Sequence, residues 1–190
     1  MEEVKYGKLV DFVHMLIKMS YKDRENLNLV DATCGNGFDT LFLCKVAGRT
    51  GKVKAFDIQE EAIERTKSLL NSNLDYKNYE VINDSHEYIN KYIEKIDAAV
   101  FNLGYLPFSD KNITTKGETT LRAIENMIPL LNDDGRIYVA TYISHDAGEE
   151  IKYILDYLRL LDKSKYNVLN INLVNKENTP PQLFIIEKNA

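Results

Sequence analysis

The stretch Asp31-Ala32-Thr33-Cys34-Gly35-Asn36-Gly37-Phe38-Asp39-Thr40 decides the fold of this chain. The apolar run Leu27 to Val30 before it predicts a short buried strand, and the apolar residues 41–43 after it open a helical pattern. A strand that ends in an acid, turns on glycine and enters a helix brings backbone amides and a helix N-terminus to one point, which favours a polar or anionic ligand. Gly35 and Gly37 permit conformations that a side chain would forbid, or let a ligand approach the backbone.

A second acid narrows the choice of ligand. A dinucleotide fingerprint would place a third glycine where this chain has Thr40. Asp57 follows the apolar run Val53 to Phe56, about twenty residues after the glycines, where an acid typically binds ribose hydroxyls. The pattern predicts a nucleoside ligand without a pyrophosphate, and it resembles motifs I and II of class I S-adenosylmethionine-dependent methyltransferases. The alternative is a plain strand–helix turn in which Asn36 or Asp39 caps the helix.

Length and composition place the chain among globular proteins. Its 190 residues predict one domain, residues 1–190, with residues 1–26 adding an N-terminal helix to it. Hydrophobic content of 44% and charged content of 28% are ordinary for a soluble protein. The formal net charge of −5 argues against a generic nucleic-acid coat, although it leaves room for a local basic patch.

Other features of the sequence point to the cytoplasm. Cys34 and Cys44 form no metal-type pair, so we expect free thiols in a reducing compartment and no bound metal. No apolar run approaches ~20 residues, which predicts no transmembrane helix. The acidic start Met1-Glu2-Glu3 does not resemble a signal peptide.

Strand and helix patterns alternate along the chain. This alternation predicts an α/β fold: a doubly wound, mostly parallel, seven-stranded Rossmann-like sheet with an antiparallel C-terminal strand. The expected strands cover residues 27–30, 52–56, 79–83, 96–102, 136–141, 166–174 and 183–187, with a turn at 133–135. The expected helices lie around residues 9–17, from 41 onward, and around 63–70, 88–93, 119–131 and 151–158. On the first helix we interpret Lys5, Lys8, His14 and Lys18 as a solvated face rather than a substrate contact.

Polar residues follow four of the predicted strands. Asp31, Asp57, Asp84 and Asn102 each stand where a strand ends. Ligands of doubly wound sheets bind at the carboxyl ends of the strands, where the strand order reverses. The sequence therefore predicts one ligand rim that all four residues share.

The stretch Asn83-Asp84-Ser85-His86 is expected to flank adenine, which is its usual place in this fold. Asp84 or Ser85 would bind the ring's polar edge, and His86 would lie against its face. In the alternative, Asp84 caps the next helix with Glu87 as its capping-box partner.

The stretch Asn102-Leu103-Gly104-Tyr105-Leu106-Pro107 occupies the place of motif IV. Methyl transfer to nitrogen requires a lone pair held in line with the sulfonium methyl carbon. An asparagine oxygen can accept the N–H bonds of the target, and a tyrosine ring can stack on it and tolerate the developing positive charge. Leu103 and Gly104 replace the two prolines of the general motif. The alternative is a tight turn with Tyr105 in the core.

Taken together, these motifs resemble the MnmM/YtqB family, long labelled rRNA methylases. The resemblance runs from about residue 27 to the end of the chain. It rests on residues 31–43, 55–59 (Ala-Phe-Asp-Ile-Gln), 84–87 (Asp-Ser-His-Glu), 101–107, 110–111, 113–115 (Ile-Thr-Thr), 119–121 and Pro180-Pro181.

The resemblance implies methylation of the amine of 5-aminomethyl-2-thiouridine at the tRNA wobble position, with S-adenosylmethionine as cofactor, by a homodimer. It implies Asn102 and Tyr105 as catalytic residues. It implies a cofactor site of Asp31, Gly35, Asn36, Asp39, Thr40, Asp57, Gln59, Ser85, His86 and Asn102. It implies a substrate site of Leu103, Gly104, Lys111, Thr114, Thr115, Tyr142 and His145.

The chain departs from the family pattern at three places: Thr33-Cys34-Gly35, the prolines missing from 142–148, and Thr179. The substrate rim is therefore less well defined than the cofactor site. We expect Lys111, Lys116 and Arg122 to contact the tRNA anticodon stem-loop, unless the 108–120 loop holds only turn and cap residues. Two other functions stay open. One is methylation of rRNA or of another amine or amide, and the other is nucleoside binding without catalysis.

Overall fold

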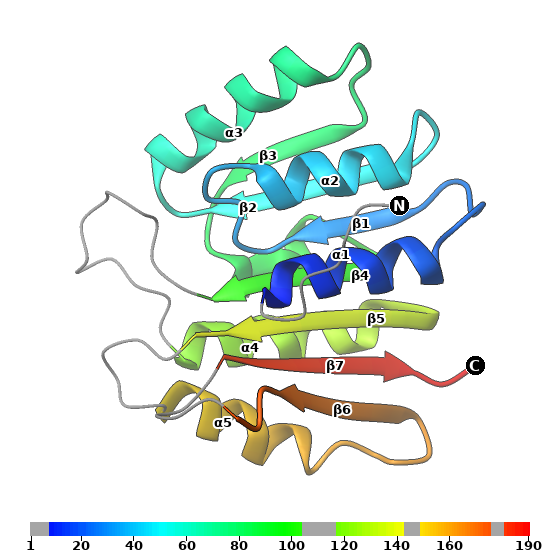
Figure 1. Ribbon diagram of the computed structural model, residues 1–190, viewed down its shortest axis with the longest axis vertical. Coiled ribbons are helices and arrows are strands. Elements are labelled where there is room, and N and C mark those ends of the chain that lie inside the picture. The colour runs from blue at the N-terminus through cyan, green and yellow to red at the C-terminus, as the bar shows by residue number, and fades with distance from the viewer. Residues whose placement is uncertain (1–7, 104–116, 143–148, 176–180) are drawn as a thin grey trace.

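A seven-stranded sheet forms the centre of the computed structural model, which describes residues 8–103, 117–142, 149–175 and 181–190 (Figure 1). The strands are β1 (Asn28–Asp31), β2 (Lys52–Asp57), β3 (Tyr79–Asn83), β4 (Ile96–Leu103), β5 (Leu131–Thr141), β6 (Tyr166–Asn172) and β7 (Gln182–Lys188). The helices are α1 (Leu9–Ser20), α2 (Phe38–Ala47), α3 (Glu60–Asn73), the 3-10 helix η1 (His86–Lys91), α4 (Gly117–Met127), the 3-10 helix η2 (Ile128–Leu130) and α5 (Glu149–Leu158).

The strand order is β3-β2-β1-β4-β5-β7-β6. Strands β1 to β5 are parallel, whereas β7 runs antiparallel between β5 and β6. The order reverses at β1, where Asp31 pairs with Ala55 of β2 on one side and with Val100 of β4 on the other. This confirms the predicted fold class and places the reversal beside the glycine loop, where doubly wound sheets bind ligands.

Two layers of helices cover the sheet, with α1 and α2 in front of it in Figure 1 and α4 behind it. Alternate residues of one strand serve the two layers: Ala98 and Val100 pack under α1 and α2, and Ala99 and Phe101 pack against η1, α4 and α5. All four are at most 5% exposed, which is why β4 reads as a continuous apolar run in the sequence.

Strand β5 begins earlier than predicted. Leu131 already pairs with Ile96, and four residues of β5 then intervene before Arg136 pairs with Ala98. The expected turn at 133–135 is therefore an irregularity within the strand, where Asp134 has a φ of 61°.

Two of the predicted helices also differ from the structure. Helix α4 ends at Met127, and the last residues of the predicted helix form η2, which contains Pro129. The predicted helix at 88–93 is the 3-10 helix η1, two residues earlier.

Cys34 and Cys44 are both buried and free, as the sequence predicts. Among the helices that the structure describes, none is long and apolar enough to cross a membrane.

Candidate active site

The glycine loop continues the pairing of β1 beyond its end. The amide of Ala32 donates to Val100 O at 2.9 Å, and the amide of Cys34 donates to Phe56 O at 2.9 Å. Gly37 then begins α2 with a φ of 82°, and a Cβ on it would lie 2.9 Å from Thr66 Cα. Since a left-handed φ and close packing both require glycine here, the loop is held tightly against α3.

Gly37 is the N-cap of α2, and no side chain caps that helix. The alternative of Asn36 or Asp39 as the cap is therefore wrong. The side-chain oxygen of Asn36 instead accepts a hydrogen bond from Arg65 of α3 at 3.1 Å.

Asp57 ends β2 and holds the loop from the side. Its two carboxylate oxygens accept the backbone amides of Gly35 and Gln59, each at 3.0 Å. The residue is partly exposed, so the remaining lone pairs of these oxygens can accept further hydrogen bonds, such as those of a ribose diol.

Ile58, the next residue, is 56% exposed although it is aliphatic. The sequence motifs did not single it out. An apolar residue directly after a strand-end acid is the sequence signal that could have marked Ile58 as an exposed apolar side chain at the rim.

Asp31 lies beneath the loop and is fully buried. Its carboxylate accepts Thr40 Oγ1 at 2.6 Å and the amide of Thr33 at 3.1 Å. Burial, followed by the nearby charge of Asp39, raises the pKa of Asp31 to about 7. The structure thus places Asp31 and Thr40 behind the loop, which they brace.

Asp39, in the first turn of α2, joins two elements across the rim. One carboxylate oxygen lies 2.7 Å from His14 Nε2, and the other accepts Asn102 Nδ2 at 3.2 Å. The His14 ring also stacks on Phe42, with ring centroids 3.6 Å apart. The prediction that His14 belongs to a solvated face is therefore wrong, because α1 turns this residue toward α2 and the rim.

The contact with Asp39 fixes the orientation of the Asn102 amide. An ionised carboxylate only accepts hydrogen bonds, so the NH₂ group of Asn102 must face Asp39. The backbone amide of Asn102 donates to Thr33 Oγ1 at 2.8 Å, which fixes the residue against the glycine loop. Its Oδ1 is consequently left as an acceptor facing away from Asp39.

Beyond β3, Ser85 rather than Asp84 caps the following helix: its hydroxyl accepts the amide of Glu87. The alternative with Asp84 as cap is therefore wrong. Asp84 instead accepts the Tyr92 hydroxyl at 2.7 Å. Tyr92 directly follows η1, and its ring packs edge-on against Phe56 of β2.

His86 begins η1 and points under the glycine loop. Its Nδ1 lies 3.0 Å from Ala32 O, and its ring meets Phe101 edge-on. Burial lowers the pKa of the imidazole, so the neutral ring donates from Nδ1 and presents Nε2 as an acceptor. Nε2 is buried and has no protein partner in the described part of the chain.

Two of the predicted substrate residues can be placed. Leu103 is 1% exposed and belongs to the core, so only its backbone could meet a substrate. Tyr142 follows β5 and packs against the buried cluster beneath α1 and α2, and its pKa is raised by burial and then by the charges of Asp39 and Asp11. The other predicted substrate-side residues, Gly104, Tyr105, Lys111, Thr114, Thr115, Lys116 and His145, lie outside the described residues.

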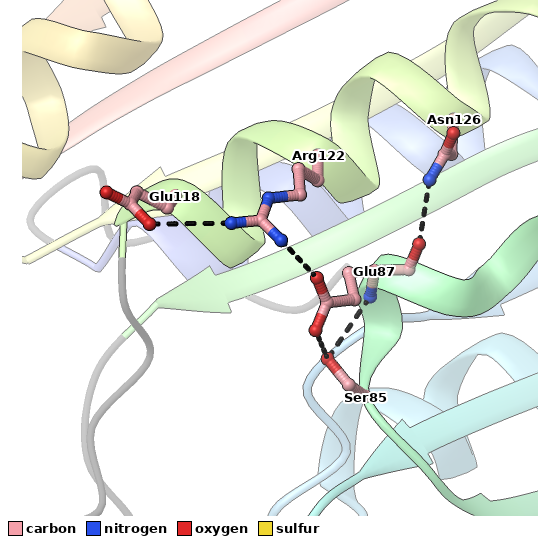
Figure 2. A network of polar contacts seen from close by, with 5 residues as sticks. All are labelled: Ser85, Glu87, Glu118, Arg122 and Asn126. Carbon is pink, nitrogen blue, oxygen red and sulfur yellow. Dashed lines mark hydrogen bonds and ion pairs between the residues drawn. The ribbon is translucent and has the colours of Figure 1, made fainter.

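Arg122, which we expected to contact RNA, has two carboxylate partners (Figure 2). One guanidinium nitrogen lies 3.2 Å from Glu87 and another lies 3.4 Å from Glu118. Asn126, one turn further along α4, donates to Glu87 O at 2.8 Å. These contacts tie α4 to η1, and the contact of Arg122 with RNA stays a prediction.

Within the described ranges, no group of three or more His, Cys, Asp or Glu side chains could hold a metal ion.

Solved structures with this architecture identify the class. A "putative rRNA-methylase" from Clostridium thermocellum superposes with a TM-score of 0.88 at 40% identity, covering 94% of this chain and 96% of that one. A "putative methyltransferase" from Streptococcus mutans, solved in complex with SAH, superposes with a TM-score of 0.84 at 37% identity, covering 95% and 98%. The fold and rim define an S-adenosylmethionine-dependent methyltransferase.

The family can be stated as well. The family described as "Putative rRNA methylase" matches residues 53–187, and the chain belongs to it. A curated relative, the chloroplastic tRNA (mnm(5)s(2)U34)-methyltransferase of Arabidopsis thaliana, is 33% identical over 172 residues. That match covers 84% of this chain but 63% of the relative, so the chain spans less than two thirds of its length.

Proposed function

We propose that this protein transfers a methyl group from S-adenosylmethionine to the primary amine of 5-aminomethyl-2-thiouridine at the tRNA wobble position. One observation carries the proposal: Asn102 Nδ2 donates to Asp39, which leaves Oδ1 on the other side of the amide as an acceptor, while the backbone amide of Asn102 bonds to Thr33 of the glycine loop. An acceptor in that place suits an N–H-bearing target. The activity named for the Arabidopsis relative supports the choice of amine.

The rim also suits the cofactor. Gly35 and Gly37 both have a positive φ, and we propose that this backbone at the N-terminus of α2 holds the methionine part of the cofactor. Asp57 would accept the ribose hydroxyls, and Ile58 would cover one face of adenine. The predicted role of His86 beside adenine belongs to the same proposal, with its ring held at Ala32 O through Nδ1. The predicted roles of Gln59 and Ser85 belong to the same proposal.

When bound, S-adenosylmethionine supplies an electrophilic methyl group on a sulfonium. Asn102 Oδ1 accepts an N–H bond of the neutral amine and so aims the nitrogen lone pair toward that carbon. Positive charge then develops on the nitrogen, and the carboxylate of Asp39, one hydrogen bond behind Asn102, stabilises it electrostatically. Tyr105 is proposed to stack on the target base.

Only the neutral amine can attack, so the single-turnover rate should rise with pH toward the pKa of the amine. A flat profile would argue against amine attack as the limiting step.

The deciding experiment is transfer of labelled methyl to tRNA from cells with and without the 5-aminomethyl-2-thiouridine precursor, followed by nucleoside analysis. Label confined to the precursor-bearing tRNA, as the methylaminomethyl nucleoside, is the expected result. The family description favours rRNA as a second candidate substrate. Label in rRNA alone would replace the tRNA proposal while leaving the cofactor proposal intact.

The same proposal includes a homodimer, one domain spanning residues 1–190, and a cytoplasmic location. The Arabidopsis relative is chloroplastic by name, so the compartment needs its own measurement. Sedimentation of the purified protein would test the dimer.

A further inference from the structure

A groove of about 650 Å³ runs between α1 and α2, on the face of the sheet that Figure 1 shows in front. It begins near the carboxyl edge of the sheet, at His14 and Phe38, and extends to the loop that follows α1. His14 is shared with the rim, because its Nε2 bonds to Asp39. The groove therefore continues directly from the candidate active site.

The walls of the groove are basic. Lys18 and Lys22 lie one helical turn apart on α1 and the residues directly after it, Arg24 follows them, and Lys45 faces them from α2. Asp23 is the one acidic residue among the side chains that line it. In a chain with a net charge of −5, this concentration of cations stands out against an acidic surface.

Three of these cations, Lys22, Arg24 and Lys45, are available to an anion. Lys22 and Lys45 are exposed, and neither has a carboxylate within ion-pair distance in the described part of the chain. Arg24 meets Asp134 only at 3.9 Å, with both side chains about half exposed. Such a pair is weak and readily exchanged for a phosphate.

The mouth of the groove carries an unusual aromatic residue. Phe38 is 67% exposed, although it is the first residue of α2 and lies next to Asp39. An exposed phenyl ring beside a row of cations is the arrangement that binds single-stranded nucleic acid, in which bases stack and phosphates pair with lysine.

We infer that the α1–α2 groove binds the ribose-phosphate backbone of the RNA substrate next to the target nucleotide, with a neighbouring base stacked on Phe38. The inference rests on the proposed function for the identity of the polymer. The opposed basic walls favour a polyanion, and the shared His14 sets the direction in which the strand leaves the rim.

The test compares the double variant K22Q/K45Q with K95Q/K163Q, which removes two exposed lysines elsewhere on the surface. Binding of unmodified tRNA is measured by fluorescence anisotropy at several KCl concentrations. We expect K22Q/K45Q to raise the Kd for tRNA about fivefold or more. We also expect the slope of log K against log[KCl] to fall in magnitude by roughly 1–2, because two phosphate contacts are lost. Phe38→Ala should weaken the Kd with little change of the slope, since a stacked ring releases no counterions.

Activity measurements separate docking from catalysis. K22Q/K45Q should raise the KM for tRNA, while the kcat at saturating tRNA and the affinity for S-adenosylhomocysteine stay within twofold of the wild type. Equal Kd and slope for both double variants would overturn the inference. A changed oligomeric state of K22Q/K45Q in sedimentation would also overturn it, because the groove would then be an interface between copies.

Failure of the two proposals can be distinguished. If wild-type protein binds no RNA, the proposed function itself fails. If wild-type protein binds and methylates tRNA and K22Q/K45Q behaves identically, only the groove is excluded.

Discussion

Asp39 organises the rim through two hydrogen bonds, to His14 and to Asn102. Because an ionised carboxylate cannot donate, it determines which end of the Asn102 amide faces the substrate. The side chain that we propose binds the target is thus oriented by Asp39, which need not touch the target itself.

Asn102→Ala removes the acceptor while leaving the glycine loop and Asp57 in place. We expect kcat to fall about 10²-fold or more, as misplacement of a reacting group does, with the affinity for S-adenosylhomocysteine within a few-fold of wild type. Single-turnover methyl transfer measures the fall in rate, and calorimetry measures the affinity for S-adenosylhomocysteine. Loss of both together would make Asn102 a cofactor or structural residue.

Asp31→Asn should change how stability depends on pH. The pKa of Asp31 is raised to about 7, so the folded state holds this proton more tightly than the unfolded state. Ionised Asp31 therefore destabilises the fold progressively from about pH 4 to pH 7, an effect absent below and complete above that window. In the variant, the side-chain amide oxygen can still accept from the Thr33 amide, and the Thr40 hydroxyl can rotate to accept from the new NH₂ group.

Urea unfolding at pH 5 and pH 8 measures the difference. At pH 8 the free energy of unfolding of Asp31→Asn should exceed that of the wild type by about 2–4 kcal/mol, relative to the difference at acid pH. A pH-independent difference between the two proteins would show that Asp31 has an ordinary pKa.

Single residues were predictable where chain position alone fixes them. Asp57 is the last residue of β2 and Asn102 the last but one of β4, so the sequence places them at the rim without knowledge of packing. His14 was not predictable in this way, because its partner Asp39 is 25 residues away and belongs to another helix. The choice between Ser85 and Asp84 as cap was not predictable either, because local sequence does not show that Asp84 accepts the Tyr92 hydroxyl.

The glycine loop acts as an element, and Gly37 is the point at which it meets α3. Gly37→Ala combines a left-handed φ of 82° with a 2.9 Å approach to Thr66 Cα. We expect a loss of about 1–3 kcal/mol in unfolding free energy and a larger loss of cofactor affinity.

Gly48→Ala is the matched control. Its φ is 62°, but a Cβ there would meet nothing within 4 Å. It should lose stability through backbone strain alone and keep its affinity for S-adenosylhomocysteine. Equal loss of affinity in both variants would mean that the loop is not the cofactor cradle.

Elements with strong periodicity were predicted well, and their boundaries less so. The run of apolar residues in β4 and the alternation of strand and helix determined the sheet. The start of β5 was missed because Asp133-Asp134-Gly135 is typical of a turn, yet Leu131 finds a partner in Ile96 before that stretch. Strand pairing is a tertiary interaction, so local turn propensity could not show it.

At the scale of the molecule, α1 covers the face of the sheet behind the rim and delivers His14 to it. Ile17 is fully buried there, whereas Met19, two residues away on the same helix, is 71% exposed. Ile17→Ala should lower the unfolding free energy by about 2–5 kcal/mol, and Met19→Ala should change it by about 0.5 kcal/mol or less.

Chemical denaturation of both variants checks this prediction. A small effect of Ile17→Ala would mean that α1 is only loosely attached to the sheet. Such a result would also weaken the argument that the α1–α2 groove keeps a fixed shape.

The order β5-β7-β6 has a consequence for biosynthesis. The strand that follows β6 in the chain takes the place between β6 and β5, so β6 has no partner in the sheet while β7 is still inside the ribosome. Until then, β5 presents an open edge that includes the buried residues Ile137 and Val139. A nascent chain paused before residue 182 should therefore be a better client for chaperones than one paused after residue 188 has emerged.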